Sequence, residues 1–316
     1  MRPSPSDPPA PAPAFDLLVI GDVNPDVVLS GAPRRLAYGQ REQLVSGGDL
    51  VLGGSGAITA CGAARLGLRV AFAGRVGDDA AGRFVLDALS AHGVDVTYCV
   101  VGPTPTAMTV VLADGHDRAI LTSPGCLPDL TVDDVPRGLA RHVHVSSYFL
   151  QPALAAGLPG LLAEERASGA STSLDTNDDP AGTWDGLAGV LPEVDVFLPN
   201  AAEAVAIAAR LATPHSLPSS VEEAAARLGA FGPLVAVKDG AEGAFAWEAG
   251  RTVRVPAVPM EPVDTVGAGD SFNAGLIAAR LRGLDLRECL RVAVTCGSLS
   301  TQAAGGTAAQ PTWKDL

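Results

Sequence analysis

The segment Asp264–Gly275, DTVGAGDSFNAG, joins small residues to a carboxylate where a helix is expected to begin. Gly267, Ala268 and Gly269 leave backbone N–H groups uncovered, and the positive end of the helix dipole adds to their effect. Such a site binds a phosphoryl group or a developing oxyanion. Asp270 follows in the first turn, where a carboxylate can accept the proton of a hydroxyl that attacks phosphorus. The simpler interpretation is that Asp270 only caps its helix.

Two segments near the N-terminus offer groups for a polyhydroxylated ligand. In GDVNPD, Asn24 supplies a donor and an acceptor, and Asp26 suits vicinal hydroxyls; an Asx turn is the simpler interpretation. The second segment, GGSGAITACGAARLG at 53–67, places glycines before a helix, so that backbone can approach a ligand closely. The groups expected to meet that ligand are Gly53, Gly54 and Ser55. Thr59 replaces the third glycine of a dinucleotide fingerprint, which disfavours a Rossmann dehydrogenase.

Two later segments suit a nucleotide and its metal ion. In LPNAAEA, Asn200 and Glu203 lie three residues apart after a predicted buried strand, a pattern that suits water-mediated Mg²⁺ contact near phosphates. The alternative is a helix start with an acidic first turn. In VAVKDGAEGAF, Lys238, Gly240 and Gly243 follow another strand, which is consistent with a nucleotide lying alongside.

The elements that must position these groups alternate along the chain. A near-continuous apolar run predicts the first strand at 15–21. The further strand candidates are 69–74, 94–100, 142–146, 171–175, 194–198 and 234–238. Helical periodicity predicts helices at 56–66, 79–92, 152–168, 184–191, 201–210, 219–230, 269–282 and 285–303. This alternation indicates an α/β fold, doubly wound, with a mostly parallel sheet covered on both faces by helices.

Some segments depart from this alternation. Residues 26–46 read as short strands around the loop PRRLAYGQ, and residues 106–122 read as a hairpin that turns at DGH. We expect these two segments to form a small β-sheet outside the body that serves as a lid. A further hairpin is predicted at 243–255.

Composition narrows the class of protein. The chain has 316 residues, of which 47% are hydrophobic and 18% charged, so it can bury a large core. A formal charge of −13 disfavours nucleic acid or anionic lipid as a partner, and no run of 18 apolar residues predicts a membrane span. Lys238 and Lys314 are the only lysines, and neither stands in a Walker P-loop.

The N-terminal segment and the cysteines indicate the extent of the folded domain and the cellular compartment. Residues 1–14 are Pro-rich and lack the apolar region of a signal peptide, so we expect a disordered tail followed by one domain over 15–316. The 5 cysteines are odd in number and form no C-x-x-C motif, which favours reduced thiols in a cytoplasmic protein.

Taken together, the glycine segment at 53–67, LPNAAEA and DTVGAGDSFNAG resemble the ribokinase-like (PfkB-type) carbohydrate kinases, in the same order and over residues 15–312. The resemblance implies a doubly wound α/β body with a β-lid, ATP as phosphoryl donor, Mg²⁺, and a sugar or nucleoside hydroxyl as acceptor.

The resemblance also implies roles for single residues. Asp270 would be the base and 267–269 the anion hole. The acceptor would meet Asn24, Asp26, Gly54 and Ser55, whereas Asn200 and Glu203 would serve metal and phosphate. A monovalent cation such as K⁺ would lie beside Asp264, with carbonyls from the loop 303–307. One departure is Ile58, where many sugar kinases carry an Asn in the glycine motif.

These observations lead to a set of expectations. We expect phosphorylation of a neutral or weakly acidic pentose, hexose or keto-sugar, because a sugar phosphate needs a basic cluster. A nucleoside kinase and a non-catalytic sugar- or nucleotide-responsive binding protein of the same fold are the alternatives. We expect Arg118 of the lid to lie over the sugar site. Pairing of two lids would form a homodimer, against the alternative of a monomer with a mobile flap.

Overall fold

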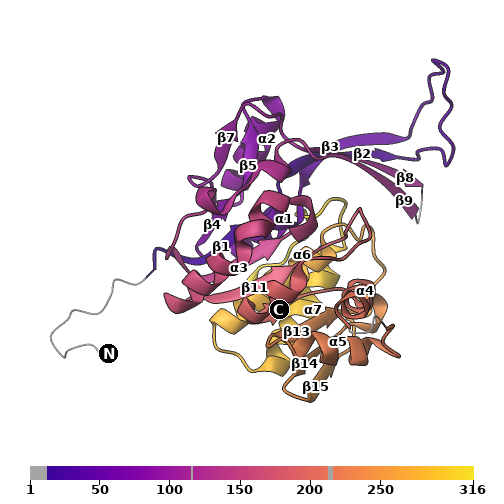
Figure 1. Ribbon diagram of the computed structural model, residues 1–316. Helices are drawn as coiled ribbons and strands as arrows, with labels where there is room; N and C mark the ends of the chain where they lie inside the picture. Colours follow the sequence, from indigo (N-terminus) through magenta and orange to yellow (C-terminus); the bar gives the residue numbers. More distant parts are fainter. Residues whose placement is uncertain (1–12, 115–116, 213–215) are drawn as a thin grey trace.

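The computed structural model describes residues 13–114, 117–212 and 216–316 (Figure 1). Nearly all of the Pro-rich tail expected over 1–14, and the hairpin turn at 115–116, lie outside the described residues. Within them, a nine-stranded sheet forms the body, with strand order β15-β14-β13-β12-β11-β10-β1-β4-β6. The strands from β13 to β6 are parallel, and β14 and β15 add an antiparallel edge.

The strand bounds are β1 (Phe15–Ile20), β4 (Val70–Ala73), β6 (Val94–Asp95), β10 (Ala140–Ser146), β11 (Ser171–Asp175), β12 (Val196–Phe197), β13 (Leu234–Lys238), β14 (Ala244–Glu248) and β15 (Arg251–Val255). The helices are α1 (Ser55–Arg65), α2 (Ala80–Ala91), α3 (Pro152–Ala167), α4 (Ala201–Leu211), α5 (Val221–Gly229), α6 (Ala268–Leu281) and α7 (Leu286–Ser300). The predicted fold class is therefore confirmed.

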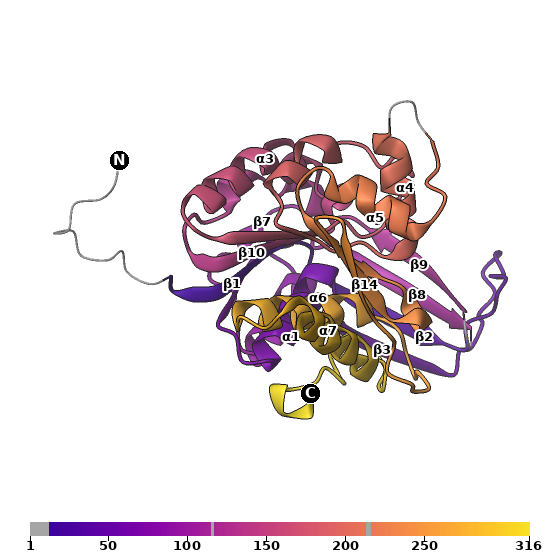
Figure 2. The ribbon, with the colours of Figure 1, turned by 90° about the horizontal axis from the view of Figure 1, so that it is seen from below.

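Helices cover both faces of the sheet because its strands are apolar on both sides (Figure 2). In β1, Leu18 and Ile20 pack into a core with α3, α4 and α5. Leu17 and Val19 point the other way, into a core with α1, α2, α6 and α7. The catalytic motifs predicted from the sequence therefore lie on helices held by a two-sided core.

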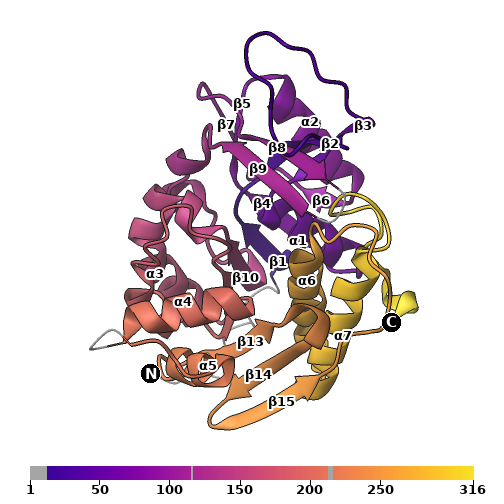
Figure 3. The same cartoon turned by 90° about the vertical axis from the view of Figure 1, so that its right-hand side faces the viewer.

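A second sheet, which we call the small sheet, projects from the body (Figures 1 and 3). Its order is β3-β2-β8-β9, with bounds β2 (Asn24–Ser30), β3 (Gly47–Gly53), β8 (Met108–Asp114) and β9 (Asp117–Ser123). Strands β2 and β8 pair in parallel, and the outer strands are antiparallel to them. Figure 3 shows β8 and β9 above α1 and α6.

Three local predictions were wrong. No strand occupies 31–46; the partner of β2 begins at Gly47, because Pro33 removes a donor and Gly39 and Gln40 have positive φ. The strand predicted at 94–100 breaks after β6, where the Asp95 carboxylate accepts from the amide of Thr97.

Of the residues predicted after the break, only Val100 is in a strand: it begins β7 (Val100–Gly102), which pairs with β5 (Arg75–Gly77). The helix predicted at 184–191 is replaced by two 3₁₀ turns, Leu187–Gly189 and Leu191–Glu193. Gly186 in a left-handed conformation and Pro192 prevent a longer helix there.

Candidate active site

The predicted anion hole is the amino end of α6. Gly267 is the N-cap with φ 72°, and a Cβ there would lie 2.7 Å from the Cα of Gly306, so only glycine fits. The first-turn amides of Gly269 and Asp270 have no carbonyl partner within the helix. Because no side chain at Gly269 covers them, these amides remain open to an anion.

Asp270 lies in this first turn, buried, with 7% of its surface exposed. Burial raises the pKa of Asp270 well above its usual value, and the nearby Asp175 and Asp22 carboxylates raise it further. Lys238 and a hydrogen bond from Ser55 oppose this shift. A carboxylate with a raised pKa is a better proton acceptor, which is what a general base requires.

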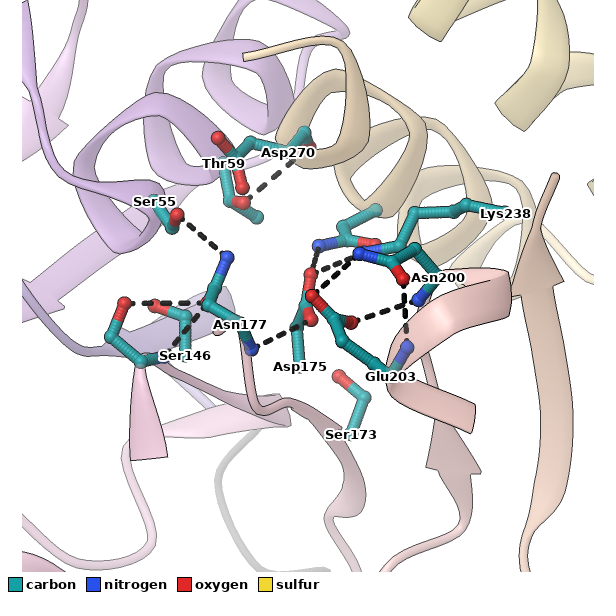
Figure 4. A network of polar contacts seen from close by, with 12 residues as sticks. Ser55, Thr59, Ser146, Ser173, Asp175, Asn177, Asn200, Glu203, Lys238 and Asp270 are labelled. Carbon is teal, nitrogen blue, oxygen red and sulfur yellow. Dashed lines mark hydrogen bonds and ion pairs between the residues drawn. The ribbon is translucent and has the colours of Figure 1, made fainter. Parts of the chain in front are cut away.

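A buried ion pair lies next to this helix. The Asp175 carboxylate at the end of β11 accepts from Nζ of Lys238, at the end of β13, and from Nδ2 of Asn273 at 2.6 Å (Figure 4). Burial lowers the pKa of Lys238, but Asp175 and Glu203 outweigh burial and raise it, so the ammonium stays charged. A Cβ at Gly269 would lie 3.6 Å from Nζ, which places this charge beside the anion hole.

Asn200 and Glu203 form a reciprocal cap at the start of α4. The amide of Glu203 donates to Oδ1 of Asn200 at 2.9 Å, and the amide of Asn200 donates to the Glu203 carboxylate at 2.8 Å. This is the helix-start alternative that the sequence left open. The Glu203 carboxylate is buried, and burial and then the charge of Asp175 raise its pKa to about 7.

Asn24 and Asp26 lie at the beginning of β2, where the small sheet leaves the body. Nδ2 of Asn24 donates to Oδ1 of Asp26 at 2.7 Å and to the hydroxyl of Thr109 at 3.1 Å. Burial raises the pKa of Asp26 to about 6. A Cβ at Gly53 would overlap the Asp26 carboxylate, so glycine is required opposite it.

The start of α1 brings the glycine motif to the same place. Gly54 is its N-cap with φ 92°, and the amides of Ser55 and Gly56 donate to the Asp22 carboxylate at 3.0 and 2.9 Å. The Ser55 hydroxyl accepts from Nδ2 of Asn177 at 2.8 Å (Figure 4). Ser55 therefore links the start of α1 to Asn177, and it also lies near the Asp270 carboxylate.

The predicted nucleotide residues line one pocket of about 610 Å³. Lys238, Gly240 and Gly243 form one wall, and Gly269 connects the pocket to the anion hole. The other walls are largely apolar; they include Phe272, Val258, Val294 and Pro259. Such a shape suits a flat base with its phosphates directed toward α6.

Arg118 and Asp264 lie together, which the sequence did not predict. Nη1 of Arg118, on β9, is 3.7 Å from Oδ1 of Asp264. The same carboxylate accepts from the amides of Val266 at 3.0 Å and Gly305 at 2.9 Å.

The sequence did not predict four polar side chains of the site: the buried Asp22, Asp175 and Asn273, and the partly exposed Asn177. Asp175 and Asn177 follow a strand that was predicted, and polar residues at the carboxyl end of a parallel strand commonly face a ligand. That signal could have identified both. Asp22 lies in the segment GDVNPD, in which only Asn24 and Asp26 were predicted to bind a ligand. Asn273 lies within a helix, and nothing in the neighbouring sequence indicates a ligand-binding residue there.

Two further features of the described residues concern clusters of metal ligands and membrane-spanning helices. Among the described residues, no group of three or more His, Cys, Asp or Glu side chains is arranged to hold a metal ion. No helix within the described ranges is long and apolar enough to cross a bilayer.

Comparisons with known proteins agree with this geometry. The model of the pfkB family of carbohydrate kinases matches residues 14–313. Klebsiella pneumoniae fructokinase is 34% identical over 285 residues, which cover 84% of this chain and 90% of that protein. Bacillus subtilis ribokinase is 29% identical over 308 residues, 95% of this chain and 98% of that protein.

Solved structures are similar over almost the whole chain. Arabidopsis thaliana ribokinase, complexed with ribose and ATP, is 26% identical with a TM-score of 0.81 and covers 96% of this chain and 97% of its own. A protein assigned as ribokinase II from E. coli, in complex with ATP and Mg²⁺, has a TM-score of 0.83 at 24% identity and covers 95% of this chain and 97% of its own.

Proposed function

The chain belongs to the pfkB family of carbohydrate kinases, and from this membership we propose that its site transfers the γ-phosphoryl group of ATP to a hydroxyl of a neutral sugar. The observation that carries the proposal is the position of Asp270. Asp270 lies in the first turn of α6, beside the open amides of this turn, and Ser55 of the acceptor side is close enough to its carboxylate to oppose the rise of its pKa.

The residues divide the work as follows. Asn24, Asp26 and Ser55 hold the sugar so that one hydroxyl faces Asp270, which takes its proton as the oxygen attacks phosphorus. The open amides of Gly269 and Asp270 and the Lys238 ammonium stabilise the negative charge on the transferring group. The sugar oxygen gains the phosphoryl group, ADP leaves, and the proton passes from Asp270 to solvent.

ATP would occupy the pocket beside α6, with Gly240 and Gly243 allowing the nucleotide to lie against backbone. Mg²⁺, when bound to the phosphates, would neutralise their charge. Glu203 would contact this ion through water, because its carboxylate already accepts from Asn200. The complexes of Arabidopsis ribokinase with ATP and of the E. coli protein with ATP and Mg²⁺ support this arrangement.

Charge supports a neutral acceptor. Asp22, Asp26 and Asp270 make the acceptor side acidic, and the guanidinium of Arg118 is engaged by Asp264. A phosphorylated sugar would meet repulsion there. The ribose found with Arabidopsis ribokinase and the fructokinase relatives point in the same direction.

A nucleoside acceptor is the second candidate, and it would need apolar surface against its base. The apolar residues that could provide this surface are packed against other side chains of the chain itself. Ile58 and Tyr148 are 3% and 6% exposed, and Phe149 packs edge-to-face between Tyr148 and Trp184. We therefore place the nucleoside second.

Measurement of kcat/KM across ribose, fructose, 2-keto-3-deoxygluconate, adenosine and fructose 1-phosphate tests this ranking. We expect a neutral sugar or the keto-acid to be preferred. A preference of about a hundredfold for adenosine corresponds to ~2.7 kcal/mol of transition-state binding. It would reverse the ranking of acceptors but would not contradict the assignment as a kinase. Absence of ADP release with every acceptor would instead favour the non-catalytic binding protein.

The small sheet is proposed to act as the lid of this kinase domain and as a dimer interface. Closure over the sugar would exclude water from the phosphoryl donor. Its strands expose apolar side chains; Leu50, Ile120 and Leu121 are 54%, 56% and 58% exposed. Pairing with the lid of a second copy would cover this surface and the edges of the sheet.

A further inference from the structure

An ion pair joins the small sheet to the loop that leads into α6. Nη1 of Arg118 lies 3.7 Å from Oδ1 of Asp264. Although burial raises the pKa of Asp26, the same guanidinium is close enough to oppose that shift. Arg118 is thus paired with Asp264, just before the anion hole, and lies within electrostatic range of Asp26 on the acceptor side.

Asp264 organises the loop from which α6 starts. Its carboxylate accepts from the amides of Val266 and Gly305 and so ties the loop before α6 to the loop at 303–307. The two loops touch, since a Cβ at Gly267 would lie 2.7 Å from the Cα of Gly306. This arrangement places a negative charge near the anion hole, where it opposes the approach of a phosphate unless a positive charge neutralises it.

A monovalent cation beside Asp264, as implied by the family resemblance, does not fit these contacts. Oδ1 accepts from Val266 and faces Arg118, and Oδ2 accepts from Gly305. A cation bound to this carboxylate would lie beside the guanidinium, and two like charges within a few ångströms repel each other strongly in a partly buried site.

We propose that Arg118 takes the place of the monovalent cation. The guanidinium neutralises Asp264 next to the anion hole, so that phosphoryl transfer needs no K⁺. Because Arg118 is on β9, this charge arrives with the small sheet and is in place when the sheet covers the sugar. The inference rests on the proposed function for its kinetic part only.

The experiment measures kcat for the best sugar under two conditions. The first buffer is free of K⁺, Na⁺ and NH₄⁺, and the second contains KCl. Choline chloride keeps the ionic strength of the two buffers equal. Wild type should change by less than about twofold. Arg118→Met should lose about tenfold without K⁺, less than direct loss of an oxyanion donor, and KCl should restore most of it. Arg118→Lys keeps a positive charge, so its kcat should depend less on K⁺ than that of Arg118→Met.

Binding is measured independently of turnover by ²⁰⁵Tl NMR titration with Tl⁺, a K⁺ substitute, and by the melting temperature with and without KCl. We expect a bound Tl⁺ and a K⁺-dependent rise in melting temperature only for Arg118→Met. Arg34→Met is the matched control, because Arg34 pairs with Asp114 at the far end of β8 and should behave as wild type.

Stoichiometric Tl⁺ binding or strict K⁺ dependence of wild type would overturn the inference, as would an Arg118→Met variant without any K⁺ response. If no sugar is phosphorylated in any salt, the proposed function fails. The Tl⁺ and melting measurements would still decide whether Arg118 or a cation serves Asp264.

Discussion

Lys238 and Asp175 form a buried ion pair, with Nζ 2.5 Å from Oδ2 and the two side chains 14% and 1% exposed. The pair lies across the carboxyl ends of β13 and β11, with β12 between them. It holds the ammonium beside Gly269 and so fixes a positive charge at the anion hole. The sequence places these two residues 63 positions apart.

Breaking this pair should cost both stability and catalysis. Lys238→Met leaves the Asp175 charge uncompensated in the interior, so we expect a loss of ~3–5 kcal/mol in the free energy of unfolding. Urea unfolding measures this loss. Adding Asp175→Asn should recover part of the stability, because it removes the stranded charge, but not kcat. Equal losses in the single and double variants would contradict the pairing. Lys314→Met is the control.

Asp270→Asn should keep the fold and the amides of the anion hole but lose the proton acceptor. We expect kcat for sugar phosphorylation, measured as ADP release, to fall by at least ~10²-fold. Wild-type activity should also fall as the pH is lowered, because burial raises the pKa of Asp270 and protonation disables the base. Near wild-type turnover by the Asn variant would show that another group accepts the proton.

Glu203 should make stability depend on pH. Burial raises its pKa to about 7, so the folded chain keeps this proton up to that pH while the unfolded chain releases it near the usual value of 4.5. Ionisation therefore costs stability as pH rises from 4.5 through 7. Glu203→Gln should be more stable relative to wild type at pH 8 than at pH 5, and should need more Mg²⁺ for half-maximal activity.

Glu223 provides a control of opposite sign. Hydrogen bonds from Ser219 lower the pKa of this exposed carboxylate to about 2. Its stabilisation is present above the unfolded pKa and is lost as pH falls toward 2, so Glu223→Gln should lose relative stability at pH 8. Chemical unfolding of the Glu203 variant at pH 5 and 8, and of the Glu223 variant at pH 3 and 8, measures the two opposite trends. Parallel pH trends would exclude the assigned shift of Glu203.

The association of the small sheets can be tested at its exposed apolar positions. Ile120→Glu with Leu121→Glu should abolish the dimer, since each places a charge at a position that is more than half exposed in one copy. Sedimentation at micromolar concentration should then give a species near the chain mass of 31.9 kDa. If wild type itself sediments only at that mass, the proposed interface does not form.

The sequence predicted those features of the fold and the site that depend on residues close together in the chain. Strand β13, with the sequence LVAVK, was predicted at the observed residues because a buried parallel strand is a continuous apolar run. The glycine positions were also predictable, since Gly54 and Gly267 carry a local backbone requirement.

What was missed depends on contacts between distant segments. Nothing near Arg118 indicates that it meets Asp264, 146 positions later. Asn200 and Glu203 have a spacing that fits both a metal site and a reciprocal cap, and only the folded geometry separated the two. The turn after Asp95 was missed because a short-range side-chain hydrogen bond overrode an apolar run.

Ile58 illustrates the same limit and can be tested. Its side chain is 3% exposed and packs behind the start of α6, where a Cβ at Gly267 would lie 3.0 Å from its Cγ2. Ile58→Asn would bury an amide there, and we expect a loss of ~2–5 kcal/mol in urea unfolding, against ~0.5–1.5 kcal/mol for Ile58→Val. An Asn variant that is fully stable and faster with a sugar would show that position 58 reaches the acceptor.

The order of the groups along the chain has a consequence for synthesis. Asn24, Asp26 and Ser55 emerge from the ribosome early, whereas the anion hole and Asp270 emerge only with the last sixth of the chain. Until α6 and α7 arrive, one face of β1 and α1 lacks its cover. An incomplete chain therefore has no means of consuming ATP, but it exposes apolar surface that a chaperone can recognise.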